Sequence, residues 1–320
     1  MEIAPGIHRL QTPLGDRFVC LFLLVGEEAT LLIDTGIDST PREHLVPYLE
    51  SNNLPLDSIR YVLTSHADFD HTGGNRSARE LLPNALFLCH RLDQPWVEDV
   101  ELMINERYCE LQADHGIGEG EESRNFIRSA SRHVPMNLTL LGGESLRLGA
   151  RWHVNILHTP GHTHGHLSVH DTNSETLIIA DAALYNAVLR TDGKPAFPPT
   201  YRYLETYLST IGSLQAMKAR TLLTSHYPAY AGGEVAEFLD ESRAFADRLD
   251  AALREELKRA TAPRTMKQLV DALAIKIGDW PEAVNEYLSV PLCGHLERLV
   301  KQGLVDSARL EERVTYRWKV

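Results

Sequence analysis

The stretch SHADFDHTGG at residues 65–74 decides our prediction of both fold and site. It places two histidines, His66 and His71, and two aspartates, Asp68 and Asp70, within six positions, after a largely apolar run and before a glycine pair. Neutral imidazole and ionised carboxylate are standard ligands of first-row metals, and a glycine-flanked loop lets several of them converge on one point. The stretch therefore predicts a metal-binding loop at the end of a strand. A solvated acidic turn is the alternative interpretation.

Three later segments place the same residue types where a predicted strand ends. His162 lies in the Pro-Gly turn of HTPGHTHGH, Asp181 ends the apolar run LIIAD, and His226 follows another apolar run in TLLTSHYP. Folds commonly present catalytic groups on loops that a rigid sheet holds in place. These three residues therefore strengthen the prediction of a metal site.

Length and composition indicate a globular protein. The chain has 320 residues, enough for one large and one smaller domain, with 43% hydrophobic and 24% charged residues. No apolar run approaches the length of a membrane span, and the N-terminus lacks the layout of a signal peptide. We expect a cytoplasmic protein with no membrane partner. The four cysteines are scattered along the chain, and we expect them to be reduced and mostly buried.

The net charge of −12 argues against nucleic acid as a partner, because phosphate binding requires a basic face. This excess of negative charge belongs to the part of the chain that holds the predicted site.

The order of predicted elements indicates an α/β fold. Strands are expected at 7–12, 18–25, 30–33, 60–64 and 86–90, helices at 40–49 and 75–82, four or five further strands between 137 and 180, and a helix at 204–219. The polar stretch 92–132 is helix-compatible and has the character of an inserted cap. Because each group of strands is followed by a helix, we expect two related αβ halves folded together as layers.

The tail has a different character. Residues 234–260 show apolar positions at helical spacing, and after the break at Pro263 we expect helices at 266–274, 281–289 and 291–302, followed by two short strands. Three helices and two strands resemble a winged-helix domain. Because the third helix is not strongly basic, we favour dimerisation or covering of the active site over DNA binding. The long helix needs a partner surface, which a homodimer or the chain itself would supply.

Five motifs in this order resemble those of the metallo-β-lactamase superfamily: LIDTG at 32–36, SHADFDHTGG, TPGHTHGH, IIADA and TSHYP. The resemblance covers roughly Glu2 to Gly233, and the tail resembles the winged-helix module of many hydrolase-like members. It implies a four-layer αββα sandwich at 1–233, a long helix with a winged-helix-like domain at 234–320, and a mononuclear or dinuclear metal site at one edge of the two sheets.

The family motif HxHxDH implies a ligand set for two metals. His66 and His162 match ligands of the first metal, Asp181 matches the bridging carboxylate, and Asp34 matches the aspartate that orients the ligands. Asp70, His71 and His226 match ligands of the second metal.

Asp68 departs from this pattern, because the family has histidine at its position and this chain reads HxDxDH. As a harder ligand, Asp68 would shift the first site from zinc towards iron or manganese. Alternatively, the first site is lost and one metal remains at Asp70, His71 and His226. We therefore expect one or two divalent ions per chain.

The resemblance implies hydrolysis of a small-molecule ester, thioester or lactone. A metal-bound water, with its pKa lowered to about 7, supplies the attacking hydroxide. Asp70 would orient that hydroxide and help to protonate the leaving group. Tyr227 is the best tyrosine candidate for a donor to the oxyanion. Neither His164 nor His166 is expected to bind metal, since ligands at alternate positions would crowd one ion.

Two other functions remain open. The tail suggests a metal-dependent nuclease acting on RNA, and Asp68 suggests a binding protein with a degenerate metal site.

Overall fold

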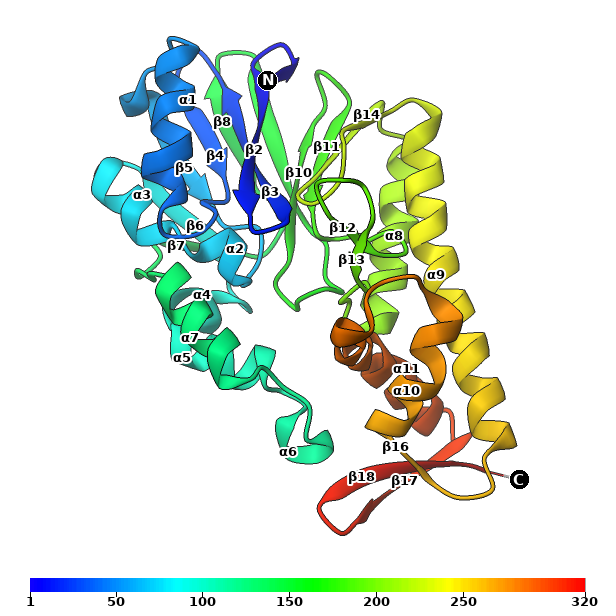
Figure 1. The fold of residues 1–320 in the computed structure, drawn as a ribbon. Coiled ribbons are helices and arrows are strands. Elements are labelled where there is room, and N and C mark those ends of the chain that lie inside the picture. Colours follow the sequence, from blue (N-terminus) through cyan, green and yellow to red (C-terminus); the bar gives the residue numbers. More distant parts are fainter. Residues whose placement is uncertain (320) are drawn as a thin grey trace.

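The computed structural model describes residues 1–319, which form two β-sheets packed face to face (Figure 1). The first sheet has seven strands in sequential order, antiparallel from β1 to β4 and parallel from β4 to β7. Its strands are β1 (Glu2–Ala4), β2 (Ile7–Leu14), β3 (Arg17–Val25), β4 (Thr30–Ile33), β5 (Ile59–Leu63), β6 (Leu86–His90) and β7 (Leu138–Leu140).

The second sheet has six strands in the order β15-β14-β11-β10-β9-β8, of which only β11 and β14 run parallel to each other. Its strands are β8 (Ser145–Gly149), β9 (Trp152–His158), β10 (Leu167–Asp171), β11 (Thr176–Ala180), β14 (Thr221–Thr224) and β15 (Tyr230–Ala231). A small hairpin, β12 (Val188–Leu189) with β13 (Pro195–Phe197), follows β11.

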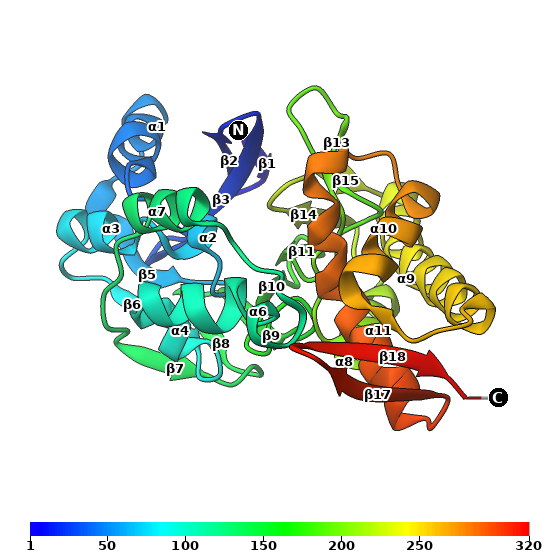
Figure 2. The ribbon, with the colours of Figure 1, turned by 60° about the horizontal axis from the view of Figure 1, so that its bottom comes forward.

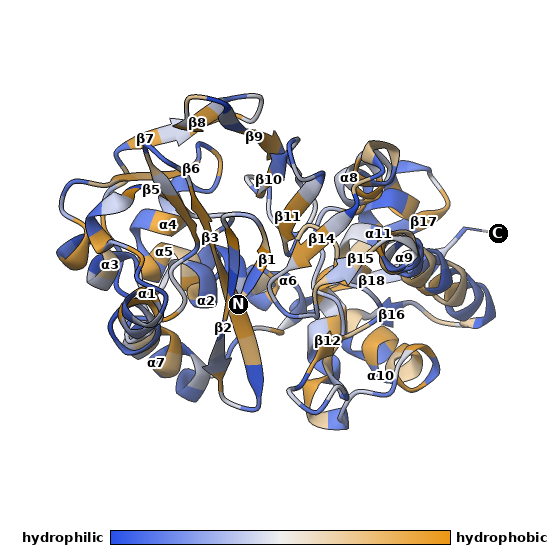
Figure 3. Ribbon diagram, turned by 90° about the horizontal axis from the view of Figure 1, so that it is seen from above, coloured by the Kyte–Doolittle hydropathy of each residue, from blue (hydrophilic) through white to orange (hydrophobic). Residues whose placement is uncertain are grey.

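Alternating side chains on each strand divide the core into layers, because successive residues of a strand point to opposite faces. On β3, Phe22 and Leu24 belong to the cluster between the sheets, together with residues of the second sheet such as Val169. Their neighbours Leu21 and Leu23 belong to a second cluster, which faces the outer helices. In Figure 3 the strands are mainly hydrophobic, whereas α9 mixes hydrophilic and hydrophobic residues.

Helices cover both outer faces and complete the four-layer αββα sandwich. A π-helical turn (Pro41–Leu45), α1 (Val46–Ser51) and α3 (Asn75–Leu81) pack on the first sheet, and α8 (Leu204–Met217) and α9 (Gly233–Arg259) pack on the second. The predicted α/β fold class and its layers are confirmed.

The polar stretch after β6 forms a helical insertion. It contains α4 (Gln94–Glu98), α5 (Val100–Met103), a π-helical turn (Ile104–Tyr108), α6 (Gln112–His115) and α7 (Glu121–Ala130). Its own small core includes Met103, Ile104 and Ile127. In Figure 2 α6 lies beside β18, where His115 stacks on Tyr316.

The tail packs on the second sheet's outer helices. It contains β16 (Arg264–Thr265), α10 (Met266–Ile277), a 3₁₀ helix (Glu282–Leu288), α11 (Ser289–Lys301), β17 (Val305–Leu310) and β18 (Arg313–Trp318). We did not predict β16, which adds a third strand to the expected pair. One hydrophobic cluster joins the tail to α8, α9 and β11. A domain boundary at residue 233 and a winged-helix role therefore stay predictions.

The apolar face of α9, which includes Phe238, Phe245 and Leu253, is buried within the chain. It therefore gives no support to a homodimer, which stays a prediction. The four cysteines are free and buried, as expected. Within residues 1–319, no helix has both the length and the apolar character needed to cross a membrane.

Arg202 connects the insertion to the tail. Its guanidinium, with 8% of the side chain exposed, contacts Glu110 at 2.7 Å and Glu297 on α11 at 2.7 Å. Glu110 lies two residues after the π-helical turn, within the insertion, so this bridge fixes that part of the insertion against α11.

We expect Arg202→Met to lower the free energy of unfolding by about 1.5–3 kcal/mol, because both carboxylates lose a charged hydrogen-bond partner. Urea denaturation followed by circular dichroism measures the change. Arg128→Met is the matched control: Arg128 pairs with Glu101 at the surface, where an ion pair contributes below about 1 kcal/mol. Equal small losses in the two variants would show that Arg202 does not hold the insertion.

Candidate metal centre

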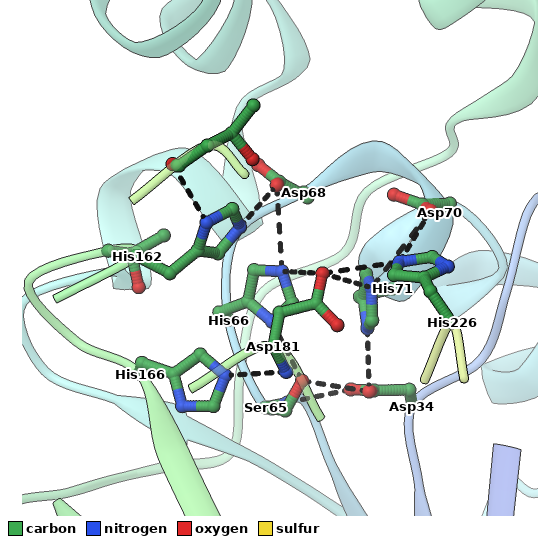
Figure 4. Close-up of polar contacts among 12 residues, drawn as sticks. Asp34, Ser65, His66, Asp68, Asp70, His71, His162, His166, Asp181 and His226 are labelled. Carbon is green, nitrogen blue, oxygen red and sulfur yellow. Dashed lines mark hydrogen bonds and ion pairs between the residues drawn. The ribbon is translucent and has the colours of Figure 1, made fainter. Parts of the chain in front are cut away.

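Three predicted histidine ligands converge on the carboxylate of Asp181, directly after β11, and Asp70 lies beside two of them (Figure 4). Asp181 Oδ2 lies 3.2 Å from His226 Nε2, 3.8 Å from His71 Nε2 and 4.0 Å from His66 Nε2. Asp70 Oδ2 lies 3.6 Å from His226 Nε2 and 4.0 Å from His71 Nε2. All five side chains are buried. The loops after β5, β11 and β14 therefore bring these residues to one point.

In His71 and His226, hydrogen bonds determine which ring nitrogen faces the Asp181 carboxylate. His71 Nδ1 lies 2.8 Å from Asp34 Oδ2, and His226 Nδ1 donates to the Phe18 carbonyl oxygen at 2.8 Å. Because a carboxylate or carbonyl oxygen accepts the Nδ1 proton, Nε2 is the atom of each ring that faces the cluster and is available to a metal.

Asp34 holds the metal loop in place through hydrogen bonds. It accepts hydrogen bonds from the Ser65 backbone N–H at 2.7 Å and the Ser65 hydroxyl at 2.8 Å, in addition to His71. The Ser65 hydroxyl also lies 2.9 Å from His66 Nδ1. Asp34 has φ of +62°, a left-handed conformation that directs its carboxylate towards the loop. One fully buried carboxylate thus orients two of the candidate ligands.

The residues around Asp181 fit a divalent metal. Within residues 1–319, His66 Nε2, His71 Nε2 and Asp181 Oδ1 are buried polar atoms that lack a hydrogen-bond partner. Buried unpaired polar atoms cost free energy, and a cation between them would satisfy their lone pairs. Two residue groups there can each hold an ion: His66, His71 and Asp181, and Asp70, His71 and His226.

The electrostatics of the cluster also favour a cation. Burial alone would raise the pKa of Asp181, but His226, His71 and His66 hold it well below its ordinary value. Burial alone would lower the pKa of His71, but Asp34 and Asp70 raise it to about 10. The site therefore keeps the Asp181 carboxylate charged and attracts positive charge, which a proton on His71 supplies without metal and a cation would supply in place of that proton.

Asp68 is engaged by an arginine that we did not predict. Arg107, on the π-helical turn of the insertion, donates through Nε to Asp68 Oδ1 and through Nη2 to Asp68 Oδ2 at 2.9 Å. Arg107 Nη2 also lies 3.0 Å from His162 Nε2, and Asp68 Oδ2 lies 2.8 Å from the same nitrogen. His66, Asp68 and His162 form a third group with metal-ligand spacing, but Arg107 contacts two of its three members.

No motif marks Arg107, which lies 39 positions from its partner. The signal in the sequence was the additional carboxylate at Asp68, because a buried charge requires a compensating one. The predicted insertion contains four arginines, Arg107, Arg124, Arg128 and Arg132. The sequence does not indicate which of them pairs with Asp68, whereas the structure shows that it is Arg107.

The other predicted residues have different surroundings. The Tyr227 hydroxyl donates to the Leu184 carbonyl oxygen at 2.6 Å within the core, so its predicted oxyanion role finds no support and we leave it out of the site. His166 Nε2 accepts from the Asp181 backbone N–H at 3.2 Å, and so holds the Asp181 backbone. His164 stacks on Tyr203 with ring centroids 3.5 Å apart.

Tyr108 is a second residue that we did not predict at the site. Its hydroxyl oxygen accepts from the Phe69 backbone N–H at 3.0 Å, within the metal loop. Burial, together with Asp68 and Asp70, raises its pKa well above the ordinary value, so the phenol keeps its proton.

Comparison with known proteins agrees with this fold. The family described as Metallo-beta-lactamase superfamily matches residues 14–226, more than half of the chain. A metallo-beta-lactamase family protein from Thermus thermophilus has a crystal structure with a TM-score of 0.77 and 23% identity, covering 99% of this chain and all of the other.

Two curated sequences are similar at lower coverage. The probable metallo-hydrolase YqgX of Bacillus subtilis is 24% identical over 56% of this chain and 73% of its own length. An acyl-coenzyme A thioesterase of Bos taurus is 24% identical over 66% of this chain and 72% of its own length.

We expect Asp34→Asn to weaken metal binding by about 10- to 100-fold, because His71 and Ser65 lose the charged acceptor that orients the ligands. Titration of the metal-free protein with Zn²⁺ in a calorimeter measures this affinity. Asp57→Asn, at an exposed position, is the control and should bind as the parent protein does. Unchanged affinity in Asp34→Asn would remove Asp34 from its orienting role.

Proposed function

We propose that this chain, which belongs to the metallo-beta-lactamase superfamily, hydrolyses a small-molecule ester or thioester at the Asp181 cluster. One observation carries the proposal: buried imidazole and carboxylate atoms that lack a hydrogen-bond partner among residues 1–319 converge there. A degenerate site in a binding protein would have no need to keep these atoms unpaired, because each of them costs stability.

The substrate class rests on charge, accessibility and similarity. The net charge of −12 disfavours a polyanion such as RNA. The exposed side-chain fraction is only 14% for Asp68 and 10% for Asp70, so both carboxylates are largely shielded from solvent, which suits a small acyl group better than a polymer. A similar protein, although at 24% identity, is named an acyl-coenzyme A thioesterase.

Asp70, His71, Asp181 and His226 would hold the metal, with His66 facing the same Asp181 oxygen. When bound, the cation would lower the pKa of a coordinated water to about 7 and polarise the substrate carbonyl. The donor set suits zinc, iron or manganese.

Two residues of the chain would move protons or bind charge. Asp70, with one side-chain oxygen towards His226, can orient the attacking water and then carry its proton to the leaving group. Tyr108 takes the role that we first gave to Tyr227. Since no residue among 1–319 accepts the Tyr108 proton, its hydroxyl is free to donate to the oxyanion.

We expect the metal-loaded protein to hydrolyse at least one member of a panel of esters, acyl-thioesters and lactones. His71→Ala and Asp181→Ala should reduce this activity to background, and a chelator should abolish it until metal is restored. Stopped assays with product detection by mass spectrometry measure turnover. A fully loaded protein that cleaves no member of the panel would contradict the proposal.

We expect Tyr108→Phe to lower kcat by about 100-fold or more with little change in KM, because the lost hydrogen bond forms only in the transition state. Tyr227→Phe discriminates between the two tyrosines. A loss of kcat in Tyr227→Phe but not in Tyr108→Phe would overturn the assignment, and unfolding curves for both variants separate stability from chemistry.

A further inference from the structure

Two groups of candidate ligands lie side by side, and their hydrogen bonding differs. Around Asp181, His71 Nε2 and Asp181 Oδ1 are buried without a hydrogen-bond partner among residues 1–319. His66 Nε2 is also unpaired and lies between the two groups, 4.0 Å from Asp181 Oδ2 and 3.5 Å from Asp68 Oδ2. Around Asp68, the corresponding atoms are already paired, because Arg107 Nη2 contacts both Asp68 Oδ2 at 2.9 Å and His162 Nε2 at 3.0 Å. Candidate ligand atoms around Asp181 are therefore unpaired, whereas those of Asp68 and His162 are already paired with Arg107.

Arg107 is largely buried between Asp68 and His162 and is not an exposed surface side chain. Its side chain is 10% exposed, and it makes a two-point contact with the Asp68 carboxylate. Its Nη1 contributes a long contact of 3.4 Å to the His162 carbonyl oxygen. Such forked pairing is stronger and more rigid than a single hydrogen bond.

The contacts of His162 also show that this position is already occupied. Its Nδ1 donates to the Thr200 carbonyl oxygen at 3.1 Å, so Nε2 is the ring nitrogen that faces Asp68 and Arg107. This Nε2 lies 2.8 Å from Asp68 Oδ2 and 3.0 Å from Arg107 Nη2, so both neighbours already occupy the side on which a metal would bind. A metal on the same nitrogen would have to displace the guanidinium and would stand beside its positive charge.

We propose that the chain holds a single metal, at Asp70, His71, Asp181 and His226, and that the Arg107 guanidinium replaces a second ion between Asp68 and His162. The inference rests on the proposed function only in requiring that the Asp181 cluster binds metal. Asp68 then serves as the partner of a fixed organic cation, and not as a metal ligand.

The insertion holds Arg107 in this position. Arg107 lies three positions before Glu110, which Arg202 ties to Glu297 on α11. The π-helical turn that carries Arg107 ends at Tyr108, whose hydroxyl contacts the metal loop at Phe69. The guanidinium is therefore held from both sides of its own turn.

Titration of metal-free protein with Co²⁺, followed by its visible absorption and by elemental analysis after gel filtration, tests the inference. The parent protein should saturate at about one Co²⁺ per chain. Arg107→Met should bind about two, since Asp68, His66 and His162 then become free to act as ligands. Asp68→His with Arg107→Met, which restores an HxHxDH loop, should also bind about two.

Arg128→Met, a change of the same kind in the insertion, is the control and should remain at one ion. Circular dichroism shows whether each variant is folded, and the count for the parent protein stands without any variant. Two ions in the parent, or one ion in the folded double variant, would overturn the inference while leaving metal-dependent hydrolysis intact. No bound Co²⁺ in the parent would overturn the proposed function as well.

Discussion

Compensation of buried negative charge is the constraint on which the site depends. Asp34, Asp68, Asp70 and Asp181 lie within one loop cluster with little or no exposure. An unpaired buried carboxylate is costly, so each requires a cation or several hydrogen bonds. Ser65 and His71 satisfy Asp34, and Arg107 satisfies Asp68. Asp70 and Asp181 share two histidines, and their surroundings leave room for a metal.

The sandwich supplies the rigidity that this arrangement needs. The ligands come from loops after β5, β11 and β14, which belong to two different sheets packed through one core. Gly73 and Gly74 follow the metal loop with negative φ angles, −58° and −81°, so they are not required for a left-handed turn. A Cβ on Gly74 would lie 2.3 Å from the Thr35 carbonyl oxygen. Gly74 is therefore required for close packing against the segment after Asp34, and Gly73 for close packing against the Phe69 and Ala130 carbonyl oxygens.

Much of the fold followed from local patterns, because strands alternate and helices repeat over short windows. Strand β6 at Leu86–His90 and helix α9 at Gly233–Arg259 lie within one residue of their predicted bounds. The candidate ligands could be predicted for the same reason, since each one follows an apolar strand. Arg107 and Tyr108 could not, because their roles depend on how a polar insertion packs against a loop 39 residues earlier. Tyr227 was misleading because adjacency to His226 does not determine where a side chain points.

The central claim is that one metal lies beside Asp181 and that Arg107 takes the second position. X-ray anomalous scattering from a crystal of metal-loaded protein, recorded on both sides of the absorption edge, tests this claim most directly. The account predicts one strong peak among Asp70, His71, Asp181 and His226, with the guanidinium of Arg107 between Asp68 and His162. A second peak of comparable height among His66, Asp68 and His162, with Arg107 displaced, would contradict it.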